Sequence, residues 1–209
     1  KYAVQEKTNG LAEAFIIGEE FIGKDKVALI LGDNIFYGTG LSSLLQKNND
    51  PEGGIIYAYH VNDPERYGVA EFDENGHVIS IEEKPKQPKS SYAIPGIYFY
   101  DNSVVEIAKN ILPSQRGELE ITDLINEYKK KGKLNFEQIG RGAIWSDAGK
   151  IEDLVNVSNY VRSVEKVQGI KIACLEEISL LKKWINKNTI KQNIKFYGNS
   201  EYSVYLKEL

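Results

Sequence analysis

Residues 27–34 read Val27-Ala28-Leu29-Ile30-Leu31-Gly32-Asp33-Asn34, an unbroken apolar run that stops at a glycine and an acid. Such a run predicts a buried strand of a parallel sheet. The spacing of apolar residues over 11–21 predicts a helix before it. A helix followed by a strand with a polar stop is typical of α/β folds, in which ligands bind at the carboxyl ends of strands. We therefore expect an α/β domain with a ligand site near Asp33.

The rest of the chain repeats this alternation of helix and strand patterns. Strands are predicted at 55–60, 69–72, 78–82, 94–100 and 134–139, with Asn75-Gly76 as a hairpin turn between the second and third of them. Helices are predicted at 41–47, 104–111, 121–131 and 151–164. From residue 168 the pattern changes to a helix at 176–184 and a polar stretch with scattered aromatic residues. We expect a core over 1–167 and a small C-terminal helical appendage over 168–209.

The composition excludes several classes of protein. The 209 residues are 42% hydrophobic and carry a net charge of −4, which argues against a nucleic-acid partner. The single Cys allows no intrachain disulfide, and no segment resembles a signal peptide or a membrane helix, so we expect a cytoplasmic protein with no membrane partner. The chain starts with Lys1 and contains no Met, from which we expect an N-terminal truncation.

Two acids that follow apolar segments are candidate metal ligands. Asp33 ends the first predicted strand, and Asp147 follows the apolar segment that ends at Trp145. Mg²⁺ prefers one or two carboxylates together with phosphate oxygens, which two acids at strand ends can supply. The alternatives are a turn residue for Asp33 and a helix N-cap for Asp147.

Two further segments have residues suited to an anionic, hydroxyl-bearing ligand. Lys84 offers a positive charge for a phosphate, and Glu83 can accept hydrogen bonds from sugar hydroxyls. Gly68, in the loop 63–69, allows a ligand to approach the backbone, and Gly10 opens a predicted helix whose N–H groups can face an anion. Read alone, the segment at 82–85 is better explained as a solvated strand end and the segment at 63–69 as a simple loop, and Gly10 is a weak signal without context.

Taken together and in order, these segments resemble the glucose-1-phosphate thymidylyltransferase family. The resemblance covers nearly the whole chain and lies in Gln5, Gly10-Leu11-Ala12-Glu13-Ala14, Leu31-Gly32-Asp33-Asn34-Ile35-Phe36-Tyr37-Gly38, Asp63-Pro64-Glu65-Arg66-Tyr67-Gly68-Val69, Glu82-Glu83-Lys84-Pro85, Arg116-Gly117-Glu118-Leu119-Glu120-Ile121-Thr122-Asp123 and Trp145-Ser146-Asp147. It implies a Rossmann-like mixed sheet flanked by helices, the nucleotide-diphospho-sugar transferase fold. The implied reaction couples dTTP to glucose 1-phosphate and yields dTDP-glucose and pyrophosphate, in the biosynthesis of dTDP-rhamnose and surface polysaccharides.

The resemblance also implies roles for particular residues. Asp33 and Asp147 correspond to the Mg²⁺ ligands, and Lys84 to the lysine that holds the sugar phosphate. The remaining implied substrate contacts are Gln5 and Gly10 at the thymine, and Asn34, Tyr67, Gly68, Glu83, Ile94, Gly96, Tyr98 and Trp145 around the sugar nucleotide.

The chain departs from the family at its beginning. The family starts with a Gly-rich loop with a Thr-Arg pair and a Lys-Pro segment, which hold the triphosphate and have no counterpart in these residues. We therefore expect residues 1–209 to be inactive by themselves. Alternatives are a non-catalytic homologue that binds sugar nucleotides, and a metal-dependent glycosyltransferase of similar fold.

The C-terminal segment resembles the family's regulatory region. Cys174-Leu175-Glu176-Glu177-Ile178 is similar to the segment at which the end product binds between subunits, but Leu181 stands where a basic residue is expected. The resemblance implies a homo-oligomer, a dimer or a tetramer, with 168–209 as its dimerisation and regulatory segment.

Overall fold

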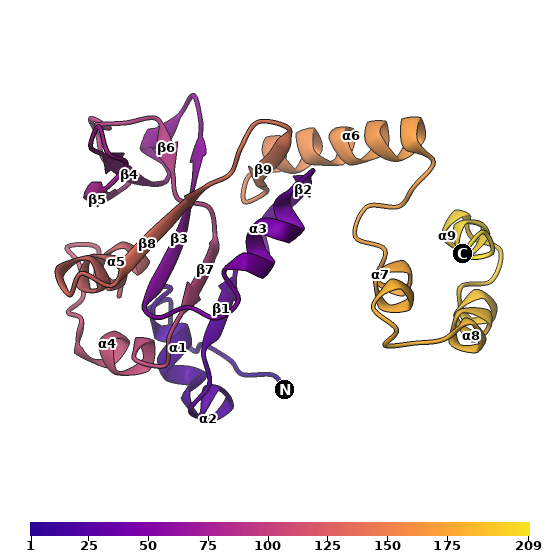
Figure 1. Cartoon of the computed structure of the whole chain (residues 1–209), viewed down its shortest axis with the longest axis horizontal. Helices are drawn as coiled ribbons and strands as arrows, with labels where there is room; N and C mark the ends of the chain where they lie inside the picture. The colour runs from indigo at the N-terminus through magenta and orange to yellow at the C-terminus, as the bar shows by residue number, and fades with distance from the viewer. The chain divides into compact units, whose positions relative to one another are not determined.

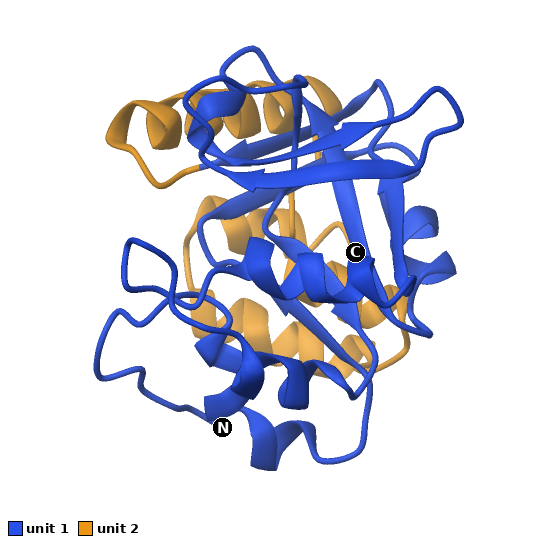
Figure 2. Ribbon diagram, turned by 90° about the vertical axis from the view of Figure 1, so that its left-hand side faces the viewer, with its two compact units in different colours: residues 1–147 blue, residues 148–209 orange.

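The computed structural model describes residues 1–209 and divides the chain into two compact units, Lys1–Asp147 and Ala148–Leu209 (Figure 2). None of the helices combines the length and the apolar character that crossing a bilayer requires. The predicted boundary after residue 167 lies near the end of helix α6 (Ile151–Gln168), whereas the division into units comes before this helix.

The first unit is built on a mixed sheet whose path of paired strands is β1-β7-β3-β6-β4-β5, with β8 also paired to β3 (Figure 1). The strands are β1 (Val27–Ile30), β3 (Gly54–His60), β4 (Gly68–Phe72), β5 (Val78–Glu83), β6 (Tyr92–Ala93), β7 (Ile97–Tyr100) and β8 (Leu134–Gln138). Only the pair β3–β8 is parallel, and all other pairs are antiparallel. The predicted mixed α/β fold is confirmed.

Both faces of the central strand β3 are covered, as its unbroken apolar sequence predicts. Ile56 faces a core with Phe15, Tyr100 and Leu124, while Tyr57 faces a second cluster. The helices of this unit are α1 (Glu13–Ile17), α2 (Glu19–Ile22), α3 (Leu41–Lys47), the short 3-10 helix η1 (Pro64–Arg66), α4 (Val104–Asn110) and α5 (Ile121–Lys130).

A separate two-stranded sheet carries the residues after the first strand. β2 (Asn34–Gly38) pairs antiparallel with β9 (Ala143–Asp147), and its register places Asn34 opposite Asp147. β2 is not predicted by the sequence pattern, whereas an apolar segment before Asp147 is. This pairing is what brings the two predicted acids to the same end of one ribbon.

Three local predictions differ from the structure. β1 is antiparallel to its only neighbour β7 and half-exposed, with Ile30 59% accessible, so the predicted buried parallel strand is wrong. An apolar run indicates a strand but does not specify its neighbours. The predicted helix over 11–21 is divided at Gly18, a poor helix former, and the predicted strand over 94–100 is interrupted at Pro95, which has no N–H to donate.

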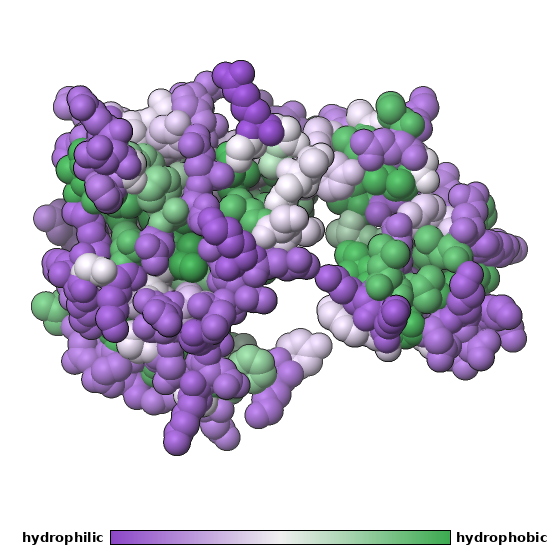
Figure 3. All heavy atoms as spheres, viewed as in Figure 1, coloured by the Kyte–Doolittle hydropathy of each residue, from purple (hydrophilic) through white to green (hydrophobic).

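The second unit is entirely helical. After α6 it contains α7 (Leu175–Leu181), α8 (Lys187–Tyr197) and α9 (Glu201–Leu206), so the predicted helical appendage is present with more helix than expected. The buried carboxylate of Glu176 accepts hydrogen bonds from the hydroxyls of Tyr197 and Tyr202 at 2.9 and 2.5 Å, which ties the three short helices together. Hydrophobic residues are visible on the surface of this unit (Figure 3). Leu175, Leu181 and Trp184 are among its exposed large hydrophobic residues.

A stack of aromatic rings crosses the core of the first unit. The rings of Tyr98 and Tyr100 lie 6.3 Å apart and those of Tyr100 and Tyr128 5.1 Å apart, both in stacked geometry. The Tyr128 hydroxyl donates to Asp101 at 2.9 Å. By contrast, the Tyr100 hydroxyl is fully buried and has no hydrogen-bond partner.

We expect Tyr100→Phe to raise the free energy of unfolding by about 1 kcal/mol, because it removes a buried hydroxyl whose desolvation is uncompensated. Tyr128→Phe is the matched control and should lower it, because that hydroxyl has a carboxylate partner. Urea unfolding of the two variants measures both changes. A loss of stability in Tyr100→Phe would show that a water molecule serves this hydroxyl.

Candidate active site

A cavity of about 290 Å³ opens in the first unit where the two sheets meet. Most of the predicted site residues line it, and they come from strand ends and loops distant in sequence: Asn34, Tyr67, Gly68, Glu83, Lys84, Ile94, Gly96, Tyr98, Trp145 and Asp147. Gln5, Gly10 and Asp33 do not line it. The structure therefore gathers most of the predicted positions around a single space.

The side chain of Asn34 connects three parts of this cavity. Its Oδ1 accepts hydrogen bonds from the Gly96 backbone N–H at 2.8 Å and from the Trp145 indole at 2.6 Å. Its Nδ2 donates to the Asp33 carboxylate at 2.8 Å. The amide thus holds β2, β9 and the loop before β7 in one arrangement.

Gly96 leaves no room for a side chain at this junction. A Cβ on Gly96 would lie 2.6 Å from side-chain carbons of Leu31 and 2.8 Å from Asn34 Oδ1. A larger residue would therefore displace the amide that organises the cavity.

Asp147 is the last residue of β9, and Asp33 lies in the turn that leads into β2. Asp147 is opposite Asn34 in the register, and Asp33 precedes Asn34 in the chain. Nowhere in the chain do three or more His, Cys, Asp or Glu side chains gather as a metal site. Two carboxylates suit Mg²⁺, which binds through one or two acids and keeps water or phosphate oxygens in its remaining positions. The donor set therefore fits a Mg²⁺ ion that is shared with a phosphate ligand.

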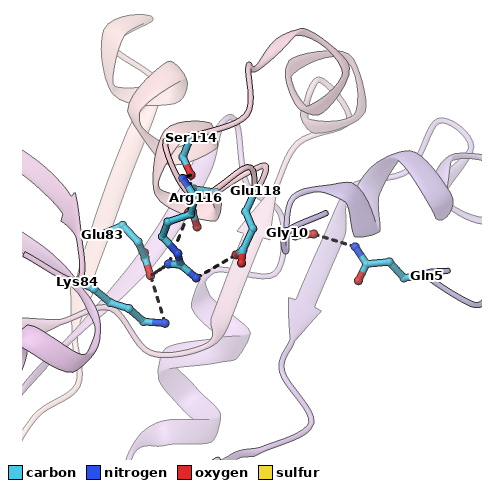
Figure 4. Close-up of polar contacts among 8 residues, drawn as sticks. Gln5, Gly10, Glu83, Lys84, Ser114, Arg116 and Glu118 are labelled. Atoms are coloured by element: carbon cyan, nitrogen blue, oxygen red, sulfur yellow. Dashed lines mark hydrogen bonds and ion pairs between the residues drawn. The ribbon is translucent and has the colours of Figure 1, made fainter. Parts of the chain in front are cut away.

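On another wall of the cavity, two cations share one carboxylate (Figure 4). Lys84 Nζ and Arg116 Nη1 each lie 3.9 Å from Glu83 Oε1. Burial raises the pKa of the Glu83 carboxyl, the positive charge of Lys84 opposes this rise, and the negative charge of Glu120 adds to it. Both distances are too long for a hydrogen bond to Glu83. Both cations line the cavity.

Arg116 is the main residue that sequence reasoning missed. It lines the cavity and also pairs with Glu118 at 3.1 Å and Glu120 at 3.6 Å. The segment 116–123 was part of the resemblance, but its acids were consistent with an ordinary helix N-terminus. The remaining lining residues not singled out are Leu11, Leu31, Arg66, Glu118, Glu120, Ile121, Thr122 and Ile125.

The predicted thymine segment lies beside the arginine segment. Leu119 donates its backbone N–H to the carbonyl of Asn9 at 2.6 Å and accepts from the N–H of Ala12 at 3.1 Å. Gly10 has φ of 105°, and a Cβ there would lie 2.5 Å from the Leu119 backbone. Only glycine fits this close approach, which binds the segment around Gln5 to the one that carries Arg116.

The comparisons with known proteins agree with this fold. Residues 1–164 match the family described as Nucleotidyl transferase, so the protein is of the nucleotidyl transferase class. Glucose-1-phosphate thymidylyltransferases of Neisseria gonorrhoeae and Mycobacterium tuberculosis are 49% and 46% identical over this whole chain, which spans 73% and 72% of their lengths. The chain belongs to the glucose-1-phosphate thymidylyltransferase family.

Solved structures give the same result. A Bacillus anthracis protein described as a glucose-1-phosphate thymidylyltransferase, solved with sucrose, matches with a TM-score of 0.69 and 43% identity, over 78% of this chain and 65% of that one. A UDP-glucose pyrophosphorylase complexed with UDP-glucose matches with a TM-score of 0.67 at 24% identity, over 78% of this chain and 66% of that one, which shows a shared fold.

Lys84 has a left-handed backbone conformation, with φ of 42°. This conformation costs a residue with a Cβ about 1–2 kcal/mol. We expect Lys84→Gly to be more stable than Lys84→Ala by about 1 kcal/mol in urea unfolding. The same two substitutions at Lys86, an exposed residue without positive φ, should give the opposite order. Equal stabilities at position 84 would mean that the backbone relaxes at no cost.

Proposed function

We propose that this cavity transfers a thymidylyl group from dTTP to glucose 1-phosphate, forming dTDP-glucose and pyrophosphate. The observation that carries the proposal is the convergence of Lys84, Arg116 and Asp147 on one cavity in a member of this family. All reactants are polyanions, and cations together with a metal-binding acid pair are what such reactants require.

The proposed reaction is a direct displacement at phosphorus. A phosphate oxygen of glucose 1-phosphate attacks the α-phosphorus of dTTP. A new P–O bond forms there, while the bond to the oxygen that bridges to the β-phosphate breaks and pyrophosphate leaves with that electron pair. Mg²⁺ held by Asp33 and Asp147 would supply charge neutralisation at the phosphates. The protein itself mainly positions the two reactants.

The individual residues have distinct proposed roles. Lys84 and Arg116 bind the phosphate of the sugar, and Glu83 accepts hydrogen bonds from the sugar hydroxyls. Tyr98 is buried beside the cavity, where burial first, and then the charges of Glu83 and Asp33, raise its pKa, so its hydroxyl stays protonated. Gln5 and Gly10 contact the thymine, an assignment that rests on the family resemblance.

The test is pyrophosphate release from dTTP, glucose 1-phosphate and Mg²⁺. We expect none from residues 1–209 alone, and turnover from a chimera in which the leading segment of the Neisseria gonorrhoeae relative precedes residue 1. In that chimera, Asp33→Asn and Asp147→Asn should each lower kcat at least about a hundredfold, because each removes a carboxylate at the reacting phosphates.

Asp25→Asn is the matched control, because Asp25 is an exposed acid away from the cavity, and it should leave the rate unchanged. An active chimera whose rate is unaffected by both Asp33→Asn and Asp147→Asn would refute the metal assignment. A chimera that binds dTDP-glucose but releases no pyrophosphate would favour a non-catalytic binding protein instead.

The raised pKa of Glu83 predicts the pH dependence of binding. The ionised carboxylate accepts hydrogen bonds from the sugar at both oxygens and more strongly than the protonated acid. A raised pKa means that Glu83 takes up a proton at a higher pH than an ordinary glutamate. As the pH is lowered, we expect the affinity for dTDP-glucose, measured by calorimetry, to begin to fall at a pH higher than that at which an ordinary glutamate is protonated. Glu83→Gln should bind more weakly at neutral pH and lose this dependence; an unchanged profile would remove Glu83 from the site.

A further inference from the structure

The amide of Gln5 has both of its N–H groups occupied by acceptors within the protein. Gln5 Nε2 donates to the Gly10 carbonyl at 3.0 Å and to Glu13 Oε2 at 2.6 Å. A carbonyl and an ionised carboxylate can only accept, so the nitrogen end of the amide must face them. The orientation of this exposed amide is therefore fixed by its neighbours, and its oxygen is left to face outward.

Glu13 is itself held in place and kept ionised. Its second oxygen, Oε1, accepts from Asn9 Nδ2 at 2.8 Å. The hydrogen bonds from Asn9 and then Gln5 lower the pKa of the Glu13 carboxyl, so that it is a carboxylate at neutral pH. As the first residue of α1, it also lies where the helix dipole favours a negative charge.

We propose that Glu13 is a positioning residue which fixes Gln5 as a hydrogen-bond acceptor and thereby makes the base site select a ring with an N–H at its recognition edge. The inference rests on the proposed function, in which Gln5 faces the base. Gly10 alone cannot impose this selection, because it occupies only one of the two N–H groups. Without Glu13 the other N–H is free to turn toward the ligand.

The selection follows from the chemistry of the pyrimidine edge. Thymine and uracil carry an N3–H, which donates to the outward oxygen of Gln5. Cytosine has a lone pair at N3, so two acceptors would face each other and neither would be satisfied. Leaving such groups unpaired in a complex is costly, which makes the polarity of one amide sufficient for discrimination.

Calorimetric binding of dTDP-glucose and dCDP-glucose to residues 1–209 with Mg²⁺ tests the proposal. The wild-type chain should bind dTDP-glucose at least about tenfold more tightly than dCDP-glucose. Glu13→Leu should abolish most of this ratio, whereas Glu13→Gln, which keeps an acceptor oxygen for Gln5, should retain it. Glu13→Lys places a donor beside Gln5, which draws the amide oxygen inward and should shift the ratio toward dCDP-glucose.

Glu6→Leu, at an exposed acid of the same segment, is the control and should leave the ratio unchanged. Thermal melting identifies any variant that does not fold. If Glu13→Leu does not fold, Glu13→Gln and Glu13→Lys still decide the outcome. A wild-type preference that survives in both Leu and Lys variants overturns the role of Glu13 and leaves the proposed function intact. A wild-type chain that binds both sugars equally, or neither, overturns the inference, while pyrophosphate release by the chimera judges the proposed function separately.

Discussion

The side-chain amide of Asn34 is the interaction on which the cavity depends. Its oxygen holds the backbone of Gly96 and the indole of Trp145, and its nitrogen holds Asp33. Each contact joins a different part of the first unit, and together they determine where the acid pair stands relative to the loop before β7. Because both ends of the amide are used, neither aspartate nor leucine could replace it: the first lacks the donor, and the second lacks both groups. The geometry of the cavity thus depends on a residue whose side chain serves as part of the framework.

Arg116, one of the two cations at Glu83, is held by several carboxylates and not by Glu83 alone. Glu83 lies between Lys84 and Arg116, and Arg116 is shared among three carboxylates. Because Arg116 is hydrogen-bonded to Glu118 but lies 3.6 Å or more from Glu120 and Glu83, it can exchange a longer contact for a phosphate while Glu118 keeps its plane oriented. Lys84, the other cation beside Glu83, has a left-handed backbone conformation. Such strained conformations persist where the surrounding structure requires them, and they are concentrated at ligand sites.

How much of this was readable from the sequence differs from element to element. The apolar run of β3 predicts a buried strand correctly because both of its faces are covered in the first unit. The similar run of β1 does not, since its exposure depends on which strands lie beside it. The proximity of Asn34 and Asp147 could not be derived from composition or spacing, because they are paired across more than a hundred residues. Arg116 was not predicted for a related reason. In the sequence, Glu118 and Glu120 are typical of a helix N-terminus, and only the fold shows that they pair with Arg116.

The backbone contact between Gly10 and Leu119 has a thermodynamic consequence. Asn9 and Ala12 hold Leu119 by its main chain, and Leu119 lies between the two acids that pair with Arg116. A ligand that orders one segment therefore lowers the entropy cost of ordering the other. If the nucleobase and the sugar phosphate bind at these two segments as we propose, linkage requires each to strengthen the binding of the other by the same factor. The close approach that Gly10 permits would then couple the two halves of the ligand.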